Sequence, residues 1–439
     1  QISSLLFAQQ NSVLSSGDWY KLGVSNNGIY KLSYSDLQDL NIQLSDLDIN
    51  SIKIYGNGGG MLPHLNSDFR NDDIEENAVF VYDYNNNGYF NSDDYILFYG
   101  ESPHEWVYNA STTLFDYKDH LYSDECYYFL TIDQSSDGKR INYKPQITNY
   151  TRIINSFNDY KFHESNFENL IESGRDWYGE RFGILDNQTF TFNFPDLLLN
   201  YPIYITTSVA ARSLNSSFFT VNINSDFISN INISNIVYDY ATEYAKRISN
   251  TQSYVSNSDQ LDVELKYNYS ENNAIGWLDR IELNARRSLR MNTSFLNFRD
   301  VESVGSLELG KFEILNSNTS TTVWDVTDPK NVKMMNTSLN GSILSFIDST
   351  TSLNHYCAFN NSFVKPSLLG KIENQNLHNI SLDVNYAIIS HPSFLSEANR
   401  LLEIHEYYDN LNSIVVTPQQ IYNEFSSGMQ DVVAIRDFL

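Results

Sequence analysis

Short stretches of alternating apolar and polar residues dominate the first third of the chain and predict β-strands. Within residues 14–150, aromatic and β-branched side chains gather in short runs that glycine and asparagine separate. The clearest runs are Ser51–Tyr55, Ala78–Tyr82 and Tyr95–Tyr99. One short helix is predicted from Tyr34 to Leu40, with Ser35 as its N-cap. Residues 14–150 are therefore predicted to form a β-rich N-terminal domain.

The same period of two continues through residues 151–375. Its clearest examples are Tyr201–Ser208, Ser217–Ile223, Leu261–Tyr267 and Leu278–Leu283. Many short strands separated by Asn, Ser and Gly are typical of a β-sandwich or jelly roll. Residues 150–178 are polar and aromatic without a clear period, and we interpret them as a connecting segment. The region as a whole is predicted to be a second, sandwich-like domain.

The pattern changes near residue 384. Tyr386–Ser390 is a continuous apolar run, which predicts a strand buried on both faces, and Ile414–Val416 predicts a second strand. Helical spacing of apolar residues follows each of them, over residues 394–405 and 421–439. Strand, helix, strand, helix is the opening of a parallel α/β domain, and two strands are too few to complete its sheet. Residues 376–439 are thus predicted to be the truncated start of such a domain.

Charge and composition exclude some classes of function. The chain has 54 Asp and Glu against 28 Lys and Arg and no basic run, which excludes a typical nucleic-acid-binding surface. No stretch reaches the ~20 apolar residues that a membrane-spanning helix needs. Residues 1–13 fit either the remnant of a signal peptide or a linker. The two cysteines, Cys126 and Cys357, are predicted to be unpaired and buried, although spacing leaves a disulfide open.

The segment Asp83–Asp94 carries the best-formed binding motif. It matches the calcium-loop pattern D-x-[DN]-x-[DN]-G with an acidic residue at position twelve, and Gly88 permits the sharp turn. Hard Ca²⁺ is bound by six to eight oxygens, and the candidate ligands supply carboxylate, amide and backbone oxygens: Asp83, Asn85, Asn87, Tyr89, Asn91 and Asp94. Only two of these are carboxylates, so weak Ca²⁺ binding is predicted. The alternative is an asparagine-rich hairpin loop that binds no metal.

Three other segments invite a chemical interpretation. Gly56–Gly60 is rich in glycine, but no Lys-Ser or Lys-Thr follows it, so a tight turn is predicted instead of a phosphate loop. His355 and Cys357 share one face of a predicted strand, yet the run around them is typical of a core strand and not of a catalytic dyad. His391 follows a predicted buried strand at the carboxyl end, where α/β enzymes bind ligands, and a capped structural loop is the competing interpretation.

Several motifs along the chain resemble one known family. They are Gly17–Lys21, Gly28–Lys31, Ile54–Pro63, Asp94–Gly100, Ser173–Phe182, Gly276–Asp279, Trp324–Thr327, Val416–Gly428 and Ala434–Leu439. Together they are similar to the pre-catalytic part of the type IX secretion (Por system) sortases, which are gingipain-type cysteine peptidases. The last two motifs resemble the first βα units of a gingipain-type catalytic domain. The resemblance implies two β-rich sandwich-like domains followed by the start of an α/β caspase/gingipain-like domain.

The family resemblance also implies a function. Such sortases remove C-terminal sorting domains from exported cargo and attach the cargo to anionic lipopolysaccharide through a thioester. The implied partners are cargo sorting domains and a PorV-like outer-membrane β-barrel, on the extracellular face of the outer membrane in Bacteroidetes. No position here matches the family's catalytic His and Cys, so we expect this chain to scaffold and dock the catalytic domain and to be inactive alone. The alternative is a secreted β-sandwich module that binds surface glycans or proteins.

Overall fold

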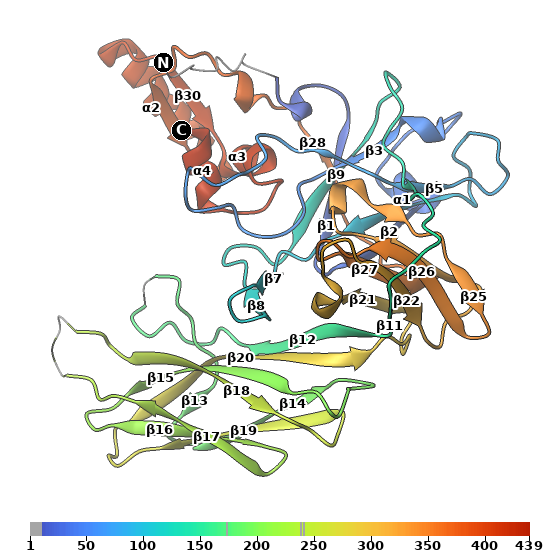
Figure 1. Cartoon of the computed structure of the whole chain (residues 1–439). Helices are drawn as coiled ribbons and strands as arrows, with labels where there is room; N and C mark the ends of the chain where they lie inside the picture. The colour runs from blue at the N-terminus through green and yellow to red at the C-terminus, as the bar shows by residue number, and fades with distance from the viewer. Residues whose placement is uncertain (1–10, 173, 238, 240–241) are drawn as a thin grey trace, which may run out of the picture.

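The chain folds into three β-rich bodies followed by a small α/β unit (Figure 1). The structure is a computed structural model that describes residues 11–172, 174–237, 239 and 242–439. It confirms the predicted fold class, because β-sheets dominate and the α/β pattern begins only near the C-terminus. None of the described helices is long and apolar enough to cross a membrane.

The first unit is built from two antiparallel sheets around one core. One sheet has the order β28-β1-β9-β3-β4, formed by Ser367–Ile372, Trp19–Val24, Cys126–Ile132, Ile52–Tyr55 and Glu76–Asn77. The other has the order β2-β6-β5, formed by Gly28–Ser33, Tyr95–Gly100 and Phe80–Tyr82. Their shared core includes Leu22, Ile54 and Phe98, all fully buried. Because β28 pairs with β1, the chain returns to this unit after more than 200 residues elsewhere.

The helix α1 (Tyr34–Asp39) packs beside these sheets and shows how local sequence sets its start. Ser33, not Ser35, is the N-cap, since its hydroxyl accepts the N–H of Asp36 while Asp36 accepts the N–H of Ser33. This reciprocal pair is a capping box. The predicted N-cap was wrong by two residues because the carboxylate at Asp36 selects the serine three positions before it.

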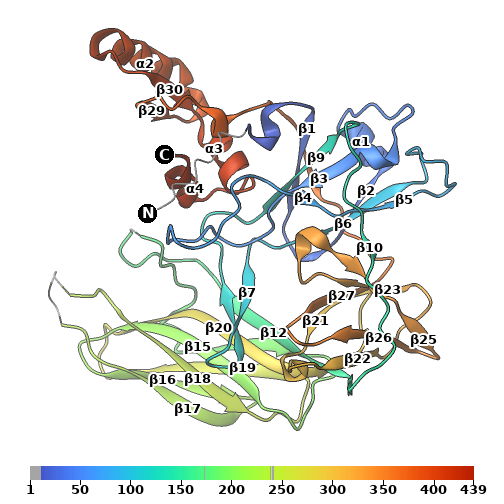
Figure 2. The ribbon, with the colours of Figure 1, turned by 45° about the horizontal axis from the view of Figure 1, so that its top comes forward.

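A two-stranded hairpin, β7 (Glu105–Asn109) and β8 (Leu114–Lys118), extends from the first unit onto the second (Figure 2). Its Trp106 ring stacks on Tyr160 at 4.1 Å between centroids. The Asn284 side chain accepts the N–H of Phe115 at 2.8 Å and donates to its carbonyl at 2.9 Å. These paired contacts fix the second unit against the first.

The second unit is a sandwich of two antiparallel sheets. One sheet has the order β12-β20-β15-β18, formed by Ser156–Glu164, Ile275–Ser288, Ile203–Arg212 and Lys246–Tyr254, with β13 (Arg181–Phe182) also on β20. The other has the order β14-β19-β16-β17, formed by Asn187–Asn193, Gln260–Asn268, Ser217–Ile223 and Asp226–Ile233. Alternating residues of both sheets, such as Phe219, Leu265 and Ile281, meet in one core.

A third body has its own core. One sheet has the order β10-β24-β23-β27-β21, formed by Asn142–Tyr143, Lys333–Met334, Thr321–Asp325, His355–Asn360 and Phe295–Arg299. The other has the order β11-β22-β26-β25, formed by Arg152–Ile154, Leu309–Ile314, Ile343–Ser349 and Ser338–Asn340. Phe298, Phe312 and Phe346 lie at the centre of its core. Residues 151–375, predicted as one sandwich-like unit, thus contain two separate hydrophobic cores.

The α/β unit consists of two parallel strands and three helices. Strands β29 (Tyr386–Ile389) and β30 (Ser413–Val416) pair in parallel, joined by α2 (Leu395–Asp409). Helices α3 (Pro418–Phe425) and α4 (Val432–Phe438) follow. The β29 residues are only partly buried, so the prediction of a strand buried on both faces was wrong for the residues present here. Short 3₁₀ turns complete the chain: Val13–Ser15, Ile49–Ser51, Val301–Ser303, Pro329–Asn331, Leu377–Asn379 and Pro392–Phe394.

The interpretation of residues 150–178 as a connecting segment was wrong. Strand β11 and the nine-residue strand β12 lie inside it, and β12 pairs along its whole length with β20. Its sequence lacks a clean apolar alternation because side chains from other elements contact both faces of β12. Phe157 faces a core, whereas Tyr160 and Phe162 receive the aromatic side chains of the β7–β8 hairpin.

Candidate functional site

The predicted calcium loop connects β5 to β6 at the surface of the first unit. Its backbone turns through positive φ at Asn86 (54°) and Gly88 (79°), where an ordinary residue would be strained. Phe90 anchors the loop, being 2% exposed and stacked on Tyr34. Two backbone hydrogen bonds, from Phe90 N–H to the Leu47 carbonyl and from Ile49 N–H to the Gly88 carbonyl, hold the loop in place.

Both carboxylates of the predicted ligand set turn inward and organise the loop. Asp83 accepts the N–H of Gly88 at 2.8 Å. Asp94 is 2% exposed and accepts the N–H groups of Tyr84 at 2.7 Å and Asn91 at 2.6 Å. These bonds place the first and twelfth positions of the motif on one side of the loop, although each carboxylate already has partners.

The remaining candidate ligands lie along the same turn. Asn85 accepts the N–H of Asn87 at 3.2 Å, and Asn87 accepts that of Tyr89 at 2.8 Å. The Asn91 amide donates to Asn87 and to the Tyr89 carbonyl. An oxygen-only set suits a hard cation such as Ca²⁺. Among the described residues no cluster of three or more His, Cys, Asp or Glu side chains could hold a metal, and Ca²⁺ binding here stays a prediction.

The glycine-rich run is neither a phosphate loop nor a free turn, because it packs against a neighbouring segment. A Cβ on Gly58 would lie 1.9 Å from the Glu101 carboxylate, and one on Gly59 would lie 2.0 Å from the backbone oxygen of Ser102. A Cβ on Gly60 would lie 2.5 Å from the Glu105 carboxyl carbon. The run therefore lacks side chains because backbone and carboxylates approach it closely.

The cysteines and histidines weighed for catalysis have structural environments. Cys126 and Cys357 are free, fully buried thiols, as predicted, and burial raises the pKa of both far above the ordinary value. Such thiols do not supply the thiolate that nucleophilic catalysis needs. His391 is an N-cap whose ring accepts the N–H of Ser393 at 3.3 Å, as the capped-loop interpretation requires.

A polar junction between the α/β unit and the first unit was not foreseen from the sequence. Glu424, on α3, is fully buried and accepts hydrogen bonds from the Gln375 side chain at 2.9 Å and the Leu377 N–H at 2.8 Å. It also pairs with the His378 ring. That contact, outweighing the effect of burial, raises the pKa of His378 to about 9 and lowers that of Glu424. The pair ties α3 to the segment that leaves the first unit.

Lys21, on β1, enters the same junction from the first unit. Its ammonium donates to the Asn423 side chain and to the Gly428 carbonyl, both at 3.1 Å, and lies 3.9 Å from the Tyr127 ring centroid. Lys21 is only 8% exposed and has no carboxylate within 4.0 Å in the part of the chain that the structure describes. Burial therefore lowers the pKa of Lys21 to about 7.

Further contacts continue the junction beneath α3 and α4. The Asp431 carboxylate accepts the N–H of Leu62 at 2.9 Å, and the Ser427 hydroxyl accepts that of Asn57 at 3.0 Å. Arg70 pairs with Asp437 at 2.9 Å. The glycine-rich segment and the residues that follow it thus form the platform on which these helices rest. Most of these pairs are more than 350 residues apart, so no local sequence pattern could have revealed them.

Comparison with known proteins agrees with this architecture. Residues 379–439 match the family model Peptidase family C25. The crystal structure of dimeric latent PorU from Porphyromonas gingivalis superimposes with a TM-score of 0.83 at 24% sequence identity, covering 98% of this chain and 40% of that chain. The chain therefore has the fold of that part of PorU and spans well under half of its length. A carbohydrate-binding module, CBM36 in complex with calcium and xylotriose, matches 23% of this chain and 73% of its own at 11% identity, with a TM-score of 0.17. No curated protein matches the chain.

Proposed function

We propose that this chain is the pre-catalytic region of a type IX secretion sortase, and that it holds the catalytic domain in position at the cell surface. In this proposal the complete protein is a cysteine peptidase and transpeptidase. It removes C-terminal sorting domains from cargo and attaches the cargo to anionic lipopolysaccharide, on the extracellular face of the outer membrane. A PorV-like outer-membrane β-barrel and the cargo sorting domains are its proposed partners.

The junction is the observation that carries the proposal. The segment that matches the peptidase family lies against the first unit through buried polar groups, and not only through apolar packing. Buried charged groups require fixed partners and penalise alternative arrangements. A scaffold that sets the position of a catalytic domain needs this kind of contact.

The test is the processing of a cargo that carries a C-terminal sorting domain. A protein in which this chain is followed by the rest of a C25 peptidase domain should release the sorting domain. The 439-residue chain alone should leave the cargo intact, because its two thiols are buried and raised in pKa. Cleavage by the chain alone that is lost in Cys126→Ala or Cys357→Ala would contradict the proposal.

The competing function, a secreted module that binds glycans or proteins, predicts a different outcome. The 439-residue chain would then bind purified surface polysaccharide with no peptidase domain present, and the longer protein would leave the cargo uncleaved. The two readouts are independent, so the same preparations decide between the functions.

A further inference from the structure

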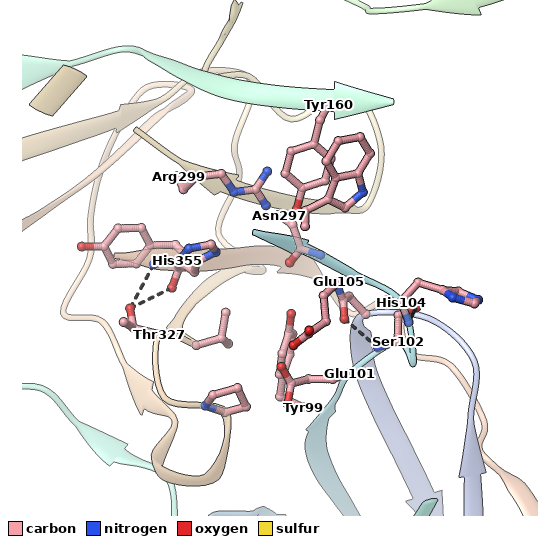
Figure 3. A pocket seen from close by; sticks show the side chains of 15 residues that line it. Tyr99, Glu101, Ser102, His104, Glu105, Tyr160, Asn297, Arg299, Thr327 and His355 are labelled. Carbon is pink, nitrogen blue, oxygen red and sulfur yellow. Dashed lines mark hydrogen bonds between the residues drawn. The ribbon is translucent and has the colours of Figure 1, made fainter. Parts of the chain in front are cut away.

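A cavity of about 220 Å³ lies where the first unit meets β12 of the second unit and β21 and β27 of the third body (Figure 3). At roughly 30 Å³ of liquid volume per water, it has room for about seven water-sized groups. Polar side chains dominate its lining, and they come from units far apart in sequence. None of the sequence motifs described above brings together the residues that form the walls of this cavity.

One wall carries two carboxylates that lack a cation. Glu101 follows β6 and Glu105 begins β7, and neither has a Lys, Arg or His nitrogen within 4.0 Å among the described residues. The glycine run Gly58–Gly60 packs against both carboxylates. Burial, with Glu105 nearby, raises the pKa of Glu101 to about 7. A positive charge in the cavity would offset both the cost of burying the Glu101 carboxylate and its repulsion by Glu105.

The facing wall carries a guanidinium that lacks an anion. Arg299, at the end of β21, is 3% exposed, and within the described ranges no carboxylate lies within 4.0 Å of it. Its Nε has no hydrogen-bond partner, and its Nη1 makes one long bond of 3.3 Å to the Asn158 carbonyl. The guanidinium lies 4.5 Å from the Tyr160 ring centroid. The Figure 3 view places Arg299 across the cavity from Glu101.

Two neighbouring groups, Asn297 and His355, leave the charge of Arg299 without compensation. The Asn297 side-chain oxygen is buried without a partner. His355 also lines the cavity, and burial together with Arg299 lowers its pKa to about 4, so the ring is neutral at neutral pH. Buried charges are almost always paired, and unsatisfied buried polar atoms are rare. Here the buried Arg299 guanidinium, the Glu101 carboxyl group and the exposed Glu105 carboxyl group all lack a partner of opposite charge and line one partly open cavity.

We propose that this cavity binds a small zwitterion, with an ammonium group held by Glu101 and Glu105 and a carboxylate held by Arg299. Such a ligand neutralises both walls at once, whereas a simple cation or anion leaves one wall unpaired. The aromatic rings of Trp106 and Tyr160 also line the cavity.

The experiment is isothermal titration of the 439-residue chain at pH 7.5 with a graded series of probes: glycine, β-alanine, 4-aminobutyrate and 6-aminohexanoate. Methylammonium and acetate, alone and as an equimolar mixture, are the single-charge controls. We expect one member of the series to bind at least tenfold more tightly than any control, because only one separation of the charges spans the cavity.

Matched variants assign the binding to the two walls. Arg299→Met and Glu105→Gln should each weaken binding of the best probe at least tenfold, and Arg299→Lys should restore part of it. Arg290→Met, at a partly exposed arginine that lies outside the cavity, should leave binding unchanged. Glu105 lies at the cavity rim and is exposed, so Glu105→Gln tests the proposal even if substitution of Arg299 prevents folding.

Four results would overturn the proposal. Equal binding of methylammonium and the best zwitterion would make the cavity a cation site, and equal binding of acetate would make it an anion site. Absence of binding by the whole series would show that water alone occupies the cavity. Binding that survives both Arg299→Met and Glu105→Gln would place the ligand elsewhere.

Discussion

Replacing Lys21 by methionine should change how stability depends on pH. Lys21 is buried in the junction, where two neutral oxygens and the Tyr127 ring replace water. Burial lowers its pKa to about 7 against an ordinary value of 10.5, and Glu125 opposes this only in part. Between these two pH values the unfolded chain binds a proton that the folded chain does not bind. The free energy of unfolding of the native protein therefore rises with pH in this window.

The magnitude follows from the same two pKa values. Each pH unit within the window contributes about 1.4 kcal/mol, reduced near the two ends where both states titrate. From pH 7.5 to 9.5 the contribution of Lys21 is about 2.5 kcal/mol. In Lys21→Met this contribution is absent, so the difference in unfolding free energy between native protein and variant should rise by about that amount. Other titrating groups are common to both proteins and cancel in the difference.

The assay is hydrogen–deuterium exchange of amides in β1 and α3 under increasing urea, repeated across this pH range. A local readout is needed because a chain of several units does not unfold in one step. Lys371→Met, on the neighbouring strand β28, is the matched control because that lysine is exposed and pairs with Asp18. A native-minus-variant difference that stays flat or falls between pH 7.5 and 9.5 would refute the reasoning about Lys21.

Three further predictions concern the calcium loop, the junction and the glycine run. Millimolar Ca²⁺ should raise the melting temperature, because a hundredfold excess over the Kd stabilises the folded state by about 2.7 kcal/mol. Mg²⁺ should raise the melting temperature less. Melting curves that Ca²⁺ leaves unchanged in both the native protein and Asp83→Ala would favour the metal-free hairpin. Glu424→Gln should destabilise the junction by about 3–5 kcal/mol, measured by exchange in α3, because His378 loses the carboxylate that stabilises its charged form. The contribution of His378 is complete below about pH 6.5 and is lost as the pH rises through about 9, so the effect of the variant should shrink there. Gly59→Ala should lower the free energy of unfolding by about 3 kcal/mol, because the new Cβ would meet backbone. Gly341→Ala, with open space around it, should lower it by about 1 kcal/mol. Equal losses of stability in thermal unfolding of the two variants would contradict this prediction.

Sequence periodicity located the elements whose packing is local or regular. Ser217–Ile223 was predicted with its observed ends, because each inward residue of that strand faces one apolar core. The two parallel strands of the α/β unit were also predicted to within one residue. Where a strand received a second layer of aromatic side chains, as β12 does from the hairpin, the alternation disappeared and the prediction failed.

The sequence by itself determined the mainly β class, the change to α/β near residue 384, the Asp83–Asp94 loop and the burial of the two cysteines. These features depend on side-chain period, composition and short-range turn chemistry, which lie within a few residues of each other. Only the tertiary structure decided that β28 returns to β1, that Lys21 and Glu424 meet in one junction, and that Glu101 and Arg299 face one cavity. Those contacts join residues tens to hundreds of positions apart. Their energies depend on burial and on the surrounding charges, which exist only once the units have packed together.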